Sequence, residues 1–179
     1  MSLLSGCIFS PDEGGGGGPP PPPSYEKNSS PDRVLVNLKK AYEARDSVYY
    51  KTLYDSSYTG KSTIVTDPNP AATAISVTYH DEVSHVAAMA RSTEITKVYM
   101  YLGAAWPRQA SDVPAHPEYA VIQLTNNYSI QVYRTTDFLT VDAGPGDEMS
   151  FTFKPTTPAA SSPTDTLWTI IQWIENTSN

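Results

Sequence analysis

The sequence predicts an α+β fold, with N-terminal helices packed against a mostly antiparallel sheet. Apolar residues recur at helical spacing after residue 31, and strand-like segments separated by turn residues follow from residue 95 onward. The closing segment, residues 166–175, is apolar on both of its faces. A strand of that kind belongs inside a sheet, so we expect the other elements to surround it.

Composition limits the size, the partners and the redox chemistry of the protein. The 179 residues suit one domain with appendages. A net charge of -7 and a sequence pI near 4.8 argue against nucleic acid as a partner, because binding to the phosphate backbone needs clustered Lys and Arg. Only 17% of the residues are charged, and twelve tyrosines add uncharged polarity, which is typical of an extracytoplasmic surface. Cys7 is the single cysteine, which excludes an internal disulfide and a Cys-rich metal site.

The N-terminal segment carries a candidate lipid-attachment site. Leu4-Ser5-Gly6-Cys7 resembles the lipobox of bacterial lipoproteins, in which signal peptidase cuts before the cysteine and the cysteine is acylated. The resemblance implies a signal-peptide remnant over residues 1–7, a membrane partner through the lipid on Cys7, and a protein anchored to the cell envelope on its extracytoplasmic side. Because few residues precede the box, we expect the coding start to lie upstream. The alternative is a free cysteine in a flexible terminus.

Residues 8–30 read as a disordered tether between this anchor and the folded domain. A glycine run, residues 14–18, precedes a proline run, residues 19–23, and the segment has almost no apolar side chains to bury. Glycines favour flexible coil and prolines favour a stiff polyproline II rod, so the tether would hold the domain away from a membrane. Two alternatives remain: the prolines dock in an aromatic groove of a partner, or both runs pack between copies of a self-assembling structural subunit.

The folded domain, residues 31–179, opens with predicted helices. A serine directly before Pro31 is a typical helix start, and Asp46 is a candidate N-cap for a second helix after a bend. We expect residues 55–57 to end that second helix. In the third helix the first turn is acidic, and the expected buried stripe consists of Val83, Val86, Ala87 and Ala90. The predicted helices span residues 31–44, 46–54 and 80–91.

Short strands fill the rest of the domain. Alternating or β-branched residues bounded by turn residues predict strands at 58–66, 74–79, 95–102, 119–125, 128–135, 149–154 and 166–175. The later strands are spaced as in an antiparallel meander. Asn126 and Asn127 suggest a tight hairpin turn, because asparagine tolerates the positive φ that such turns need. Residues 144–147 suggest a second turn, and residues 155–164 a polar loop.

Two stretches resemble the NTF2-like (cystatin-like α+β) superfamily. Residues 38–46, continuing to Leu53-Tyr54, look like its opening helix pair, and residues 167–174 look like its final strand. The resemblance implies a curved sheet that wraps the helices into a cone whose open end forms a pocket. Members of the superfamily include isomerases, dehydratases, scaffold proteins and binding domains, so the fold does not fix the function.

An enzymatic hypothesis follows from that resemblance. Ketosteroid isomerases and related members place tyrosine and carboxyl groups inside the cone for proton transfer, which here suggests Tyr42 with Asp137 or Asp142. Burial would raise the pKa of such a carboxyl toward neutrality and make it a usable base. The alternative is that Tyr42 belongs to the core and Asp142 is solvated. His80 and His85 are five apart with no third ligand nearby, so we predict no metal and no cofactor.

Aromatic residues suggest a binding surface instead. Trp106, Tyr99, Tyr101 and Tyr133, joined by Tyr119 and Tyr128, suit contact with a sugar, peptide or protein, although the tyrosines could simply cover the outer face of the sheet. The leading hypothesis is a surface-tethered, non-enzymatic binding or assembly domain with an unidentified protein or small-molecule partner, and homo-oligomers are possible. A small-molecule isomerase or dehydratase using the cone pocket is the alternative, which a closed, aromatic-filled cone would exclude.

Overall fold

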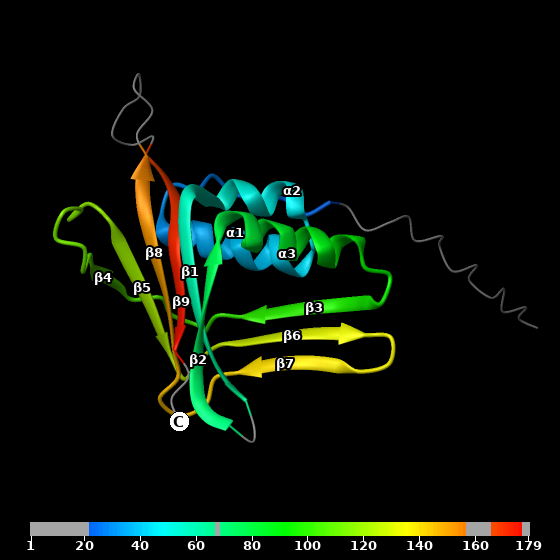
Figure 1. The fold of residues 1–179 in the computed structure, drawn as a ribbon. Coiled ribbons are helices and arrows are strands. Elements are labelled where there is room, and N and C mark those ends of the chain that lie inside the picture. Colours follow the sequence, from blue (N-terminus) through cyan, green and yellow to red (C-terminus); the bar gives the residue numbers. More distant parts are fainter. Residues whose placement is uncertain (1–21, 67–68, 157–165, 177–179) are drawn as a thin grey trace, which may run out of the picture.

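The computed structural model describes residues 22–66, 69–156 and 166–176. Figure 1 shows two sheets that meet at a steep angle, with the helices lying in the angle between them. The predicted α+β class, helices packed against a curved and mainly antiparallel sheet, is confirmed. No helix in these described ranges is long and apolar enough to cross a membrane.

The first helix, α1 (Pro31–Glu43), forms as predicted. The hydroxyl of Ser30 caps it by accepting a hydrogen bond from the backbone N–H of Arg33, 3.3 Å away. Apolar residues recur in this helix every three or four positions, so they form one stripe that is buried against the sheets. The buried residues of that stripe are Val34, Leu35, Leu38, Ala41 and Tyr42.

The second helix is shorter than predicted. Asp46 caps α2 (Ser47–Tyr50), accepting from the backbone N–H of Tyr49 at 3.0 Å, and a single 3₁₀ turn, η1 (Lys51–Leu53), follows. Strand β1 (Tyr54–Thr66) then begins at once, so the prediction that residues 55–57 end a helix was wrong. The Asp55 carboxylate accepts from the N–H and hydroxyl of Ser57, which stabilises a local irregularity inside a strand.

The third helix, α3 (Tyr79–Arg91), has a reciprocal capping box between Thr78 and Asp81, as the acidic first turn suggested. Its inward line differs from the expected stripe, because Val86 and Met89 are buried while Ala90 is exposed. The inward face is therefore rotated relative to the prediction. This rotation brings an acidic residue of the first turn, Glu82, onto the inner side of the helix.

The strands form two sheets instead of one meander. After β1 the strands are β2 (Asn69–Thr78), β3 (Ile95–Tyr101), β4 (Arg108–Ala110), β5 (Ala120–Thr125), β6 (Ser129–Arg134), β7 (Phe138–Asp142), β8 (Glu148–Thr156) and β9 (Leu167–Asn176). The six-stranded sheet has the order β2-β1-β9-β8-β5-β4 and the three-stranded sheet the order β3-β6-β7. The closing strand β9 is an interior strand, as predicted, parallel to β1 and antiparallel to β8. Strands β4 and β7 were not predicted.

The predicted hairpin at Asn126 and Asn127 was wrong, because β5 and β6 belong to different sheets. Asn126 does adopt a positive φ of 52°, but its side chain accepts from Gly146 at 2.6 Å and its N–H donates to the carbonyl of Asp147. The predicted turn at residues 144–147 is present, closed by the Asp147 N–H on the Gly144 carbonyl at 3.1 Å. The two crossings between the sheets are thus tied to each other by hydrogen bonds.

A bulge in β9 sets which side chains face the helices. Ile170 pairs with Phe153 and Gln172 pairs with Thr152, so one residue of β9 is left over between them. The extra residue places Ile170 and Trp173, three positions apart, both in the core. Alternation from Trp173 then directs Glu175 inward as well.

An N-terminal arm, residues 24–29, lies along α1. Asn37 of α1 is fully buried, and its amide exchanges hydrogen bonds with the backbone N–H and C=O of Glu26 at 3.0 and 2.8 Å. Tyr25 stacks on Tyr49 and donates to the Asp46 carboxylate at 2.8 Å. These arm residues fall in the segment that the sequence assigns to the tether, while Cys7 and the glycine run lie outside the described residues.

Candidate functional site

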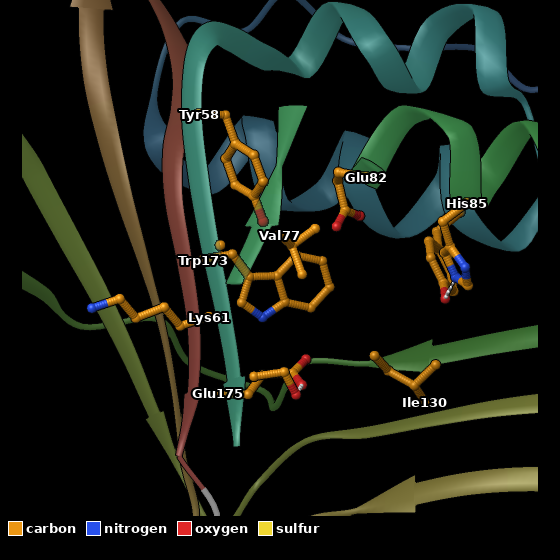
Figure 2. Close-up of a pocket in the computed structure, with 11 residues that line it drawn as sticks. Tyr58, Lys61, Val77, Glu82, His85, Ile130, Trp173 and Glu175 are labelled. Atoms are coloured by element: carbon orange, nitrogen blue, oxygen red, sulfur yellow. Dashed lines mark hydrogen bonds between the residues drawn. The ribbon is translucent and has the colours of Figure 1, made fainter. Parts of the chain in front are cut away.

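A pocket of about 140 Å³ lies inside the cone, between the helices and the concave side of the large sheet. Figure 2 shows side chains from both layers converging on it. Helices α1 and α3 provide its upper wall, strands β1, β2 and β9 form the sheet side, and Ile130 of β6 closes it from the small sheet. The lining residues are Tyr42, Tyr58, Gly60, Lys61, Ser62, Val77, Glu82, His85, Ile130, Trp173 and Glu175.

Glu82 is an acidic residue on the inward line of α3, four positions before the buried Val86. The Tyr50 hydroxyl donates a 2.5 Å hydrogen bond to its Oε1, and the Tyr54 hydroxyl lies 2.6 Å from that of Tyr50. Burial raises the pKa of Glu82, the negative charge of Glu175 raises it further, and the Tyr50 hydrogen bond lowers it in part. Glu82 is thus held by tyrosines in a poorly solvated place.

Glu175 enters the same pocket from the opposite side, near the end of β9. The Ser62 hydroxyl on the neighbouring strand β1 donates to its Oε2 at 3.0 Å. Burial raises the pKa of Glu175 above the ordinary value for a glutamate. Two carboxyl groups from elements far apart in the sequence therefore share one small cavity (Figure 2).

The basic residues of the lining do not balance these carboxyl groups. Lys61 contributes its stem, but its ammonium group points away from the pocket (Figure 2). His85 is hydrogen-bonded to the Tyr42 hydroxyl at 3.2 Å, and partial burial lowers the pKa of its ring, which favours the neutral form. The titratable groups of the pocket therefore give it a negative electrostatic character wherever the glutamates are ionised.

Trp173 is the largest side chain of the lining and is only 7% exposed. Its indole Nε1 is buried and finds no hydrogen-bond acceptor among the described residues. Figure 2 shows the nitrogen on the edge of the ring that faces the side of the pocket where Glu175 lies. Most buried N–H groups in proteins are satisfied, so this one calls for a partner that the described chain does not supply.

Gly60 makes room for another pocket residue. A Cβ at this position would lie 2.5 Å from the hydroxyl oxygen of Tyr58 and 3.2 Å from Val77. The backbone of Gly60 does not require glycine, because its φ is not in the left-handed region. Because Gly60 has no side chain, the Tyr58 hydroxyl has room beside it and points into the pocket (Figure 2).

The residues proposed for catalysis from the sequence are not together. Tyr42 is buried on α1 and lines the pocket. Asp137 is exposed in the turn between β6 and β7, where it forms an ion pair with Arg134. Asp142 is exposed at the end of β7 and accepts from the Thr140 hydroxyl at 2.9 Å. Neither aspartate lines the pocket.

The residues proposed for binding lie elsewhere as well. Trp106 packs against the core and donates its Nε1 hydrogen to the Leu102 carbonyl at 2.6 Å. Tyr99 and Tyr101 are exposed on β3, and Tyr99 meets Tyr133 of β6 edge to face at 5.8 Å. Tyr128 is buried, and Tyr119 stacks on His116.

No group of three or more His, Cys, Asp or Glu side chains in the described ranges is arranged to hold a metal ion. His80 is exposed, and His85 contacts Tyr42 instead of a second histidine. The lining of the pocket offers carboxyl, hydroxyl, imidazole and indole groups.

Sequence reasoning missed Glu82 and Glu175. A usable signal for Glu82 was its spacing of four and seven from Val86 and Met89, which places a carboxyl on a helix's buried line. For Glu175 the signal was its spacing of two from Trp173 in an interior strand. Acidic residues in a first helical turn and at a strand end are usually solvated, so both signals were easy to pass over.

Comparison with known proteins identifies the fold of the chain. No protein-family profile and no curated protein sequence matches the chain. An NTF2-like superfamily protein from Salmonella enterica serovar Typhimurium superposes with a TM-score of 0.51 at 10% identity, covering 82% of this chain and 87% of that one. A candidate beta subunit of an aromatic-ring-hydroxylating dioxygenase from Novosphingobium aromaticivorans gives 0.50 at 9% identity, covering 85% and 90%. The architecture is thus NTF2-like.

Proposed function

We propose that this protein is a surface-tethered, non-enzymatic binding protein whose cone pocket takes a small organic molecule. The observation that carries the proposal is the cavity of about 140 Å³ in which two half-buried carboxyl groups converge with a buried indole N–H that has no acceptor among the described residues. Concave sites with an apolar wall and a few converging polar groups are the usual form of ligand pockets. Trp173, Tyr58 and Val77 supply the apolar wall here.

Binding is favoured over assembly because the polar groups face inward. Trp106 packs against the core and Trp173 and Tyr58 are buried, so these three side chains are not exposed anchors for a protein partner. The aromatic residues exposed on the small sheet are Tyr99, Tyr101 and Phe138. The exposed tyrosines of β3 remain available for a protein contact. They do not form a hollow with converging polar groups, which the cone interior does.

The tether is the second part of the proposal. The resemblance of residues 4–7 to a lipobox supports a lipid on Cys7, an envelope membrane as partner and an extracytoplasmic location. The test is intact-mass analysis and detergent partitioning of protein produced from its natural reading frame, compared with Cys7→Ser. A lipid-sized mass increase that the variant loses supports the anchor, and an unmodified, soluble wild-type chain refutes it.

Proton transfer is a second candidate function, and one observation favours it. Glu82 has a raised pKa because of burial, and it lies on the pocket with Tyr42 and His85. A carboxyl group with a raised pKa is better suited to general acid or base catalysis than an ordinary solvated glutamate. A proton-transfer function predicts that the protein converts an enolisable ketone or a hydroxy-ketone, measured by loss of substrate absorbance. Glu82→Gln should abolish this turnover.

The pocket is tested by ligand-observed NMR with a library of small polar fragments. We expect fragments to bind the wild-type domain and to lose affinity in Val77→Phe, because the Val77 side chain points into the pocket (Figure 2). Ser76→Phe is the matched control, since Ser76 is exposed and points to the other face of β2. Equal binding by both variants, or no binding by the wild-type domain, would refute the pocket as the site.

A further inference from the structure

The two glutamates of the pocket form an electrostatic arrangement that is unfavourable without a partner. Glu82 and Glu175 point into the same cavity, and the charge of one raises the pKa of the other. Each has one neutral hydrogen-bond donor, Tyr50 and Ser62 respectively, and neither forms a salt bridge within the described chain. Two like charges in a poorly solvated place are stabilised most strongly by a positive charge between them.

The walls of the pocket suit the same kind of charge. Trp173, Tyr58 and Tyr42 contribute aromatic rings to the lining of the pocket that the carboxyl groups share. Aromatic rings attract cations through the negative potential of their faces, and tryptophan does so most strongly. Aromatic walls combined with carboxylates are therefore the chemistry that recognises an organic ammonium ion.

The indole of Trp173 adds a second requirement that is independent of the carboxyl groups. Its Nε1–H is a donor only, it is buried, and it has no acceptor among the described residues. An ammonium group cannot accept this hydrogen bond. A ligand that satisfies Trp173 as well as the glutamates must carry an oxygen acceptor next to its cationic group.

The size of the cavity limits the ligand. At about 140 Å³ it is comparable to the roughly 150 Å³ engineered cavity that holds a benzene molecule, which corresponds to about six non-hydrogen atoms. A small amino alcohol or a choline-sized cation would fit.

We infer that the cone pocket binds a small organic ammonium ion bearing a hydrogen-bond acceptor, with Glu82 and Glu175 neutralising its charge and Trp173 donating to its oxygen. The inference rests on the proposed binding function and names its ligand class. The rings of Tyr58 and Trp173 flank the cationic group, and Lys61 stays outside because its ammonium is directed away (Figure 2).

The test compares choline with its neutral carbon isostere, in which a tert-butyl group replaces the trimethylammonium group. Both are titrated into the full chain by isothermal calorimetry at pH 8, where the glutamates are most fully ionised. We expect choline to bind at least about tenfold more tightly than the isostere, because the two differ only in charge. Glu175→Gln and Glu82→Gln should each weaken choline binding by about tenfold or more while leaving the isostere unaffected.

Glu118→Gln is the matched control, since Glu118 is an exposed carboxylate outside the pocket, paired with His116. Thermal unfolding of each variant shows whether it is folded, and the comparison of the two ligands on the wild-type chain does not depend on any variant. Equal affinity for choline and the isostere, or unchanged choline affinity in both Gln variants, overturns the ammonium inference while the binding function stands. Absence of choline binding also overturns it, and the fragment experiment with Val77→Phe then decides the binding function separately.

Discussion

The hydroxyl of Tyr50 donates a 2.5 Å hydrogen bond to the carboxyl group of Glu82, which belongs to a different helix 32 residues later in the chain. Tyr50 is fully buried, and the Tyr54 hydroxyl lies 2.6 Å from its own. Because Tyr50 has a single hydroxyl proton, its bond to an ionised Glu82 requires Tyr54 to be the donor in the second bond. The two tyrosines thereby orient Glu82 toward the pocket.

Tyr50→Phe should destabilise the protein more at alkaline than at acidic pH. The hydrogen bond lowers the pKa of Glu82, so it favours the ionised carboxylate. Loss of a hydrogen bond to a buried charged group costs about 1–3 kcal/mol. Urea denaturation at pH 8 and at pH 5 measures the difference in the free energy of unfolding, with the exposed Tyr101→Phe as control. A destabilisation of equal size at both pH values would contradict the assigned hydrogen bond.

The double variant Glu82→Gln/Glu175→Gln should remove a pH dependence of stability. Both folded-state pKa values lie above the ordinary glutamate value of 4.5, so the folded state holds protons that the unfolded state has already released. Their stabilising contribution is complete below pH 4.5 and is lost as the pH rises through the raised pKa values. The wild-type protein should therefore lose stability relative to the double variant between pH 4.5 and 8.

The other titratable groups of the pocket are present in both the wild-type protein and the double variant, so the difference between their stabilities reports on the two glutamates. His85 has a lowered pKa and contributes with the opposite sign, since its stability contribution is lost as the pH falls. The raised pKa values of Tyr42, Tyr50 and Tyr58 affect only alkaline solutions, and Lys61 points away from the carboxyl groups. Parallel stability curves for the wild-type protein and the double variant over pH 4.5–8 would rule out the raised pKa values.

Gly60→Ala should alter the pocket while retaining the fold. The new Cβ would lie 2.5 Å from the Tyr58 hydroxyl oxygen, so the tyrosine ring must move, and the backbone conformation of Gly60 is open to alanine. We expect weaker binding of pocket fragments by about tenfold and a loss of stability near 1 kcal/mol, because a small strain is added to a packed wall. Ligand titration and urea denaturation measure the two effects. Unchanged fragment affinity would show that Tyr58 does not contact the ligand.

Arg45→Gln should destabilise the junction between the helices and the small sheet. The Arg45 guanidinium donates to the carbonyl of Ile95 at 2.8 Å and to those of Met89 and Ser92 at 3.4 Å, which caps the C-terminal end of α3. Loss of these bonds should cost about 1–3 kcal/mol in the free energy of unfolding. Arg33→Gln is the matched control, because Arg33 forms an exposed ion pair with Glu26 and its loss should cost much less. Equal losses in the two variants would contradict the capping role.

Local signals in the sequence were enough for the helices and for the interior position of the last strand. The spacing of Val34, Leu38 and Ala41 follows from helix geometry alone, and the two apolar faces of β9 follow from its place between β1 and β8. The partition into two sheets depends on tertiary hydrogen bonds. An asparagine at residue 126 is an equally good sequence signal for a hairpin turn and for a connection between two sheets. In the structure it connects the sheets and is hydrogen-bonded to Gly146 and Asp147.

The candidate site was predictable only in part for a related reason. The resemblance of the chain to the NTF2-like superfamily is enough to predict Tyr42 inside the cone. The inward positions of Glu82 and Glu175 depend instead on the rotation of α3 and on the bulge in β9. A one-residue bulge between Ile170 and Gln172 has no signature in the sequence, yet it fixes which side of the strand Glu175 occupies. Asp137 and Asp142, which the resemblance suggests as catalytic carboxyl groups, lie outside the pocket.

The most direct measurement of the pocket as a ligand site is the set of indole N–H signals in a ¹H–¹⁵N NMR titration with a fragment that binds. The chain has 3 tryptophans, and their signals are assigned by single replacement with phenylalanine. We predict that the Trp173 signal shifts saturably, because its N–H has no acceptor among the described residues and gains one from the ligand, while the Trp106 signal stays, since it is bonded to Leu102. A shift of Trp106 with Trp173 unchanged would place the ligand elsewhere and contradict the proposed site.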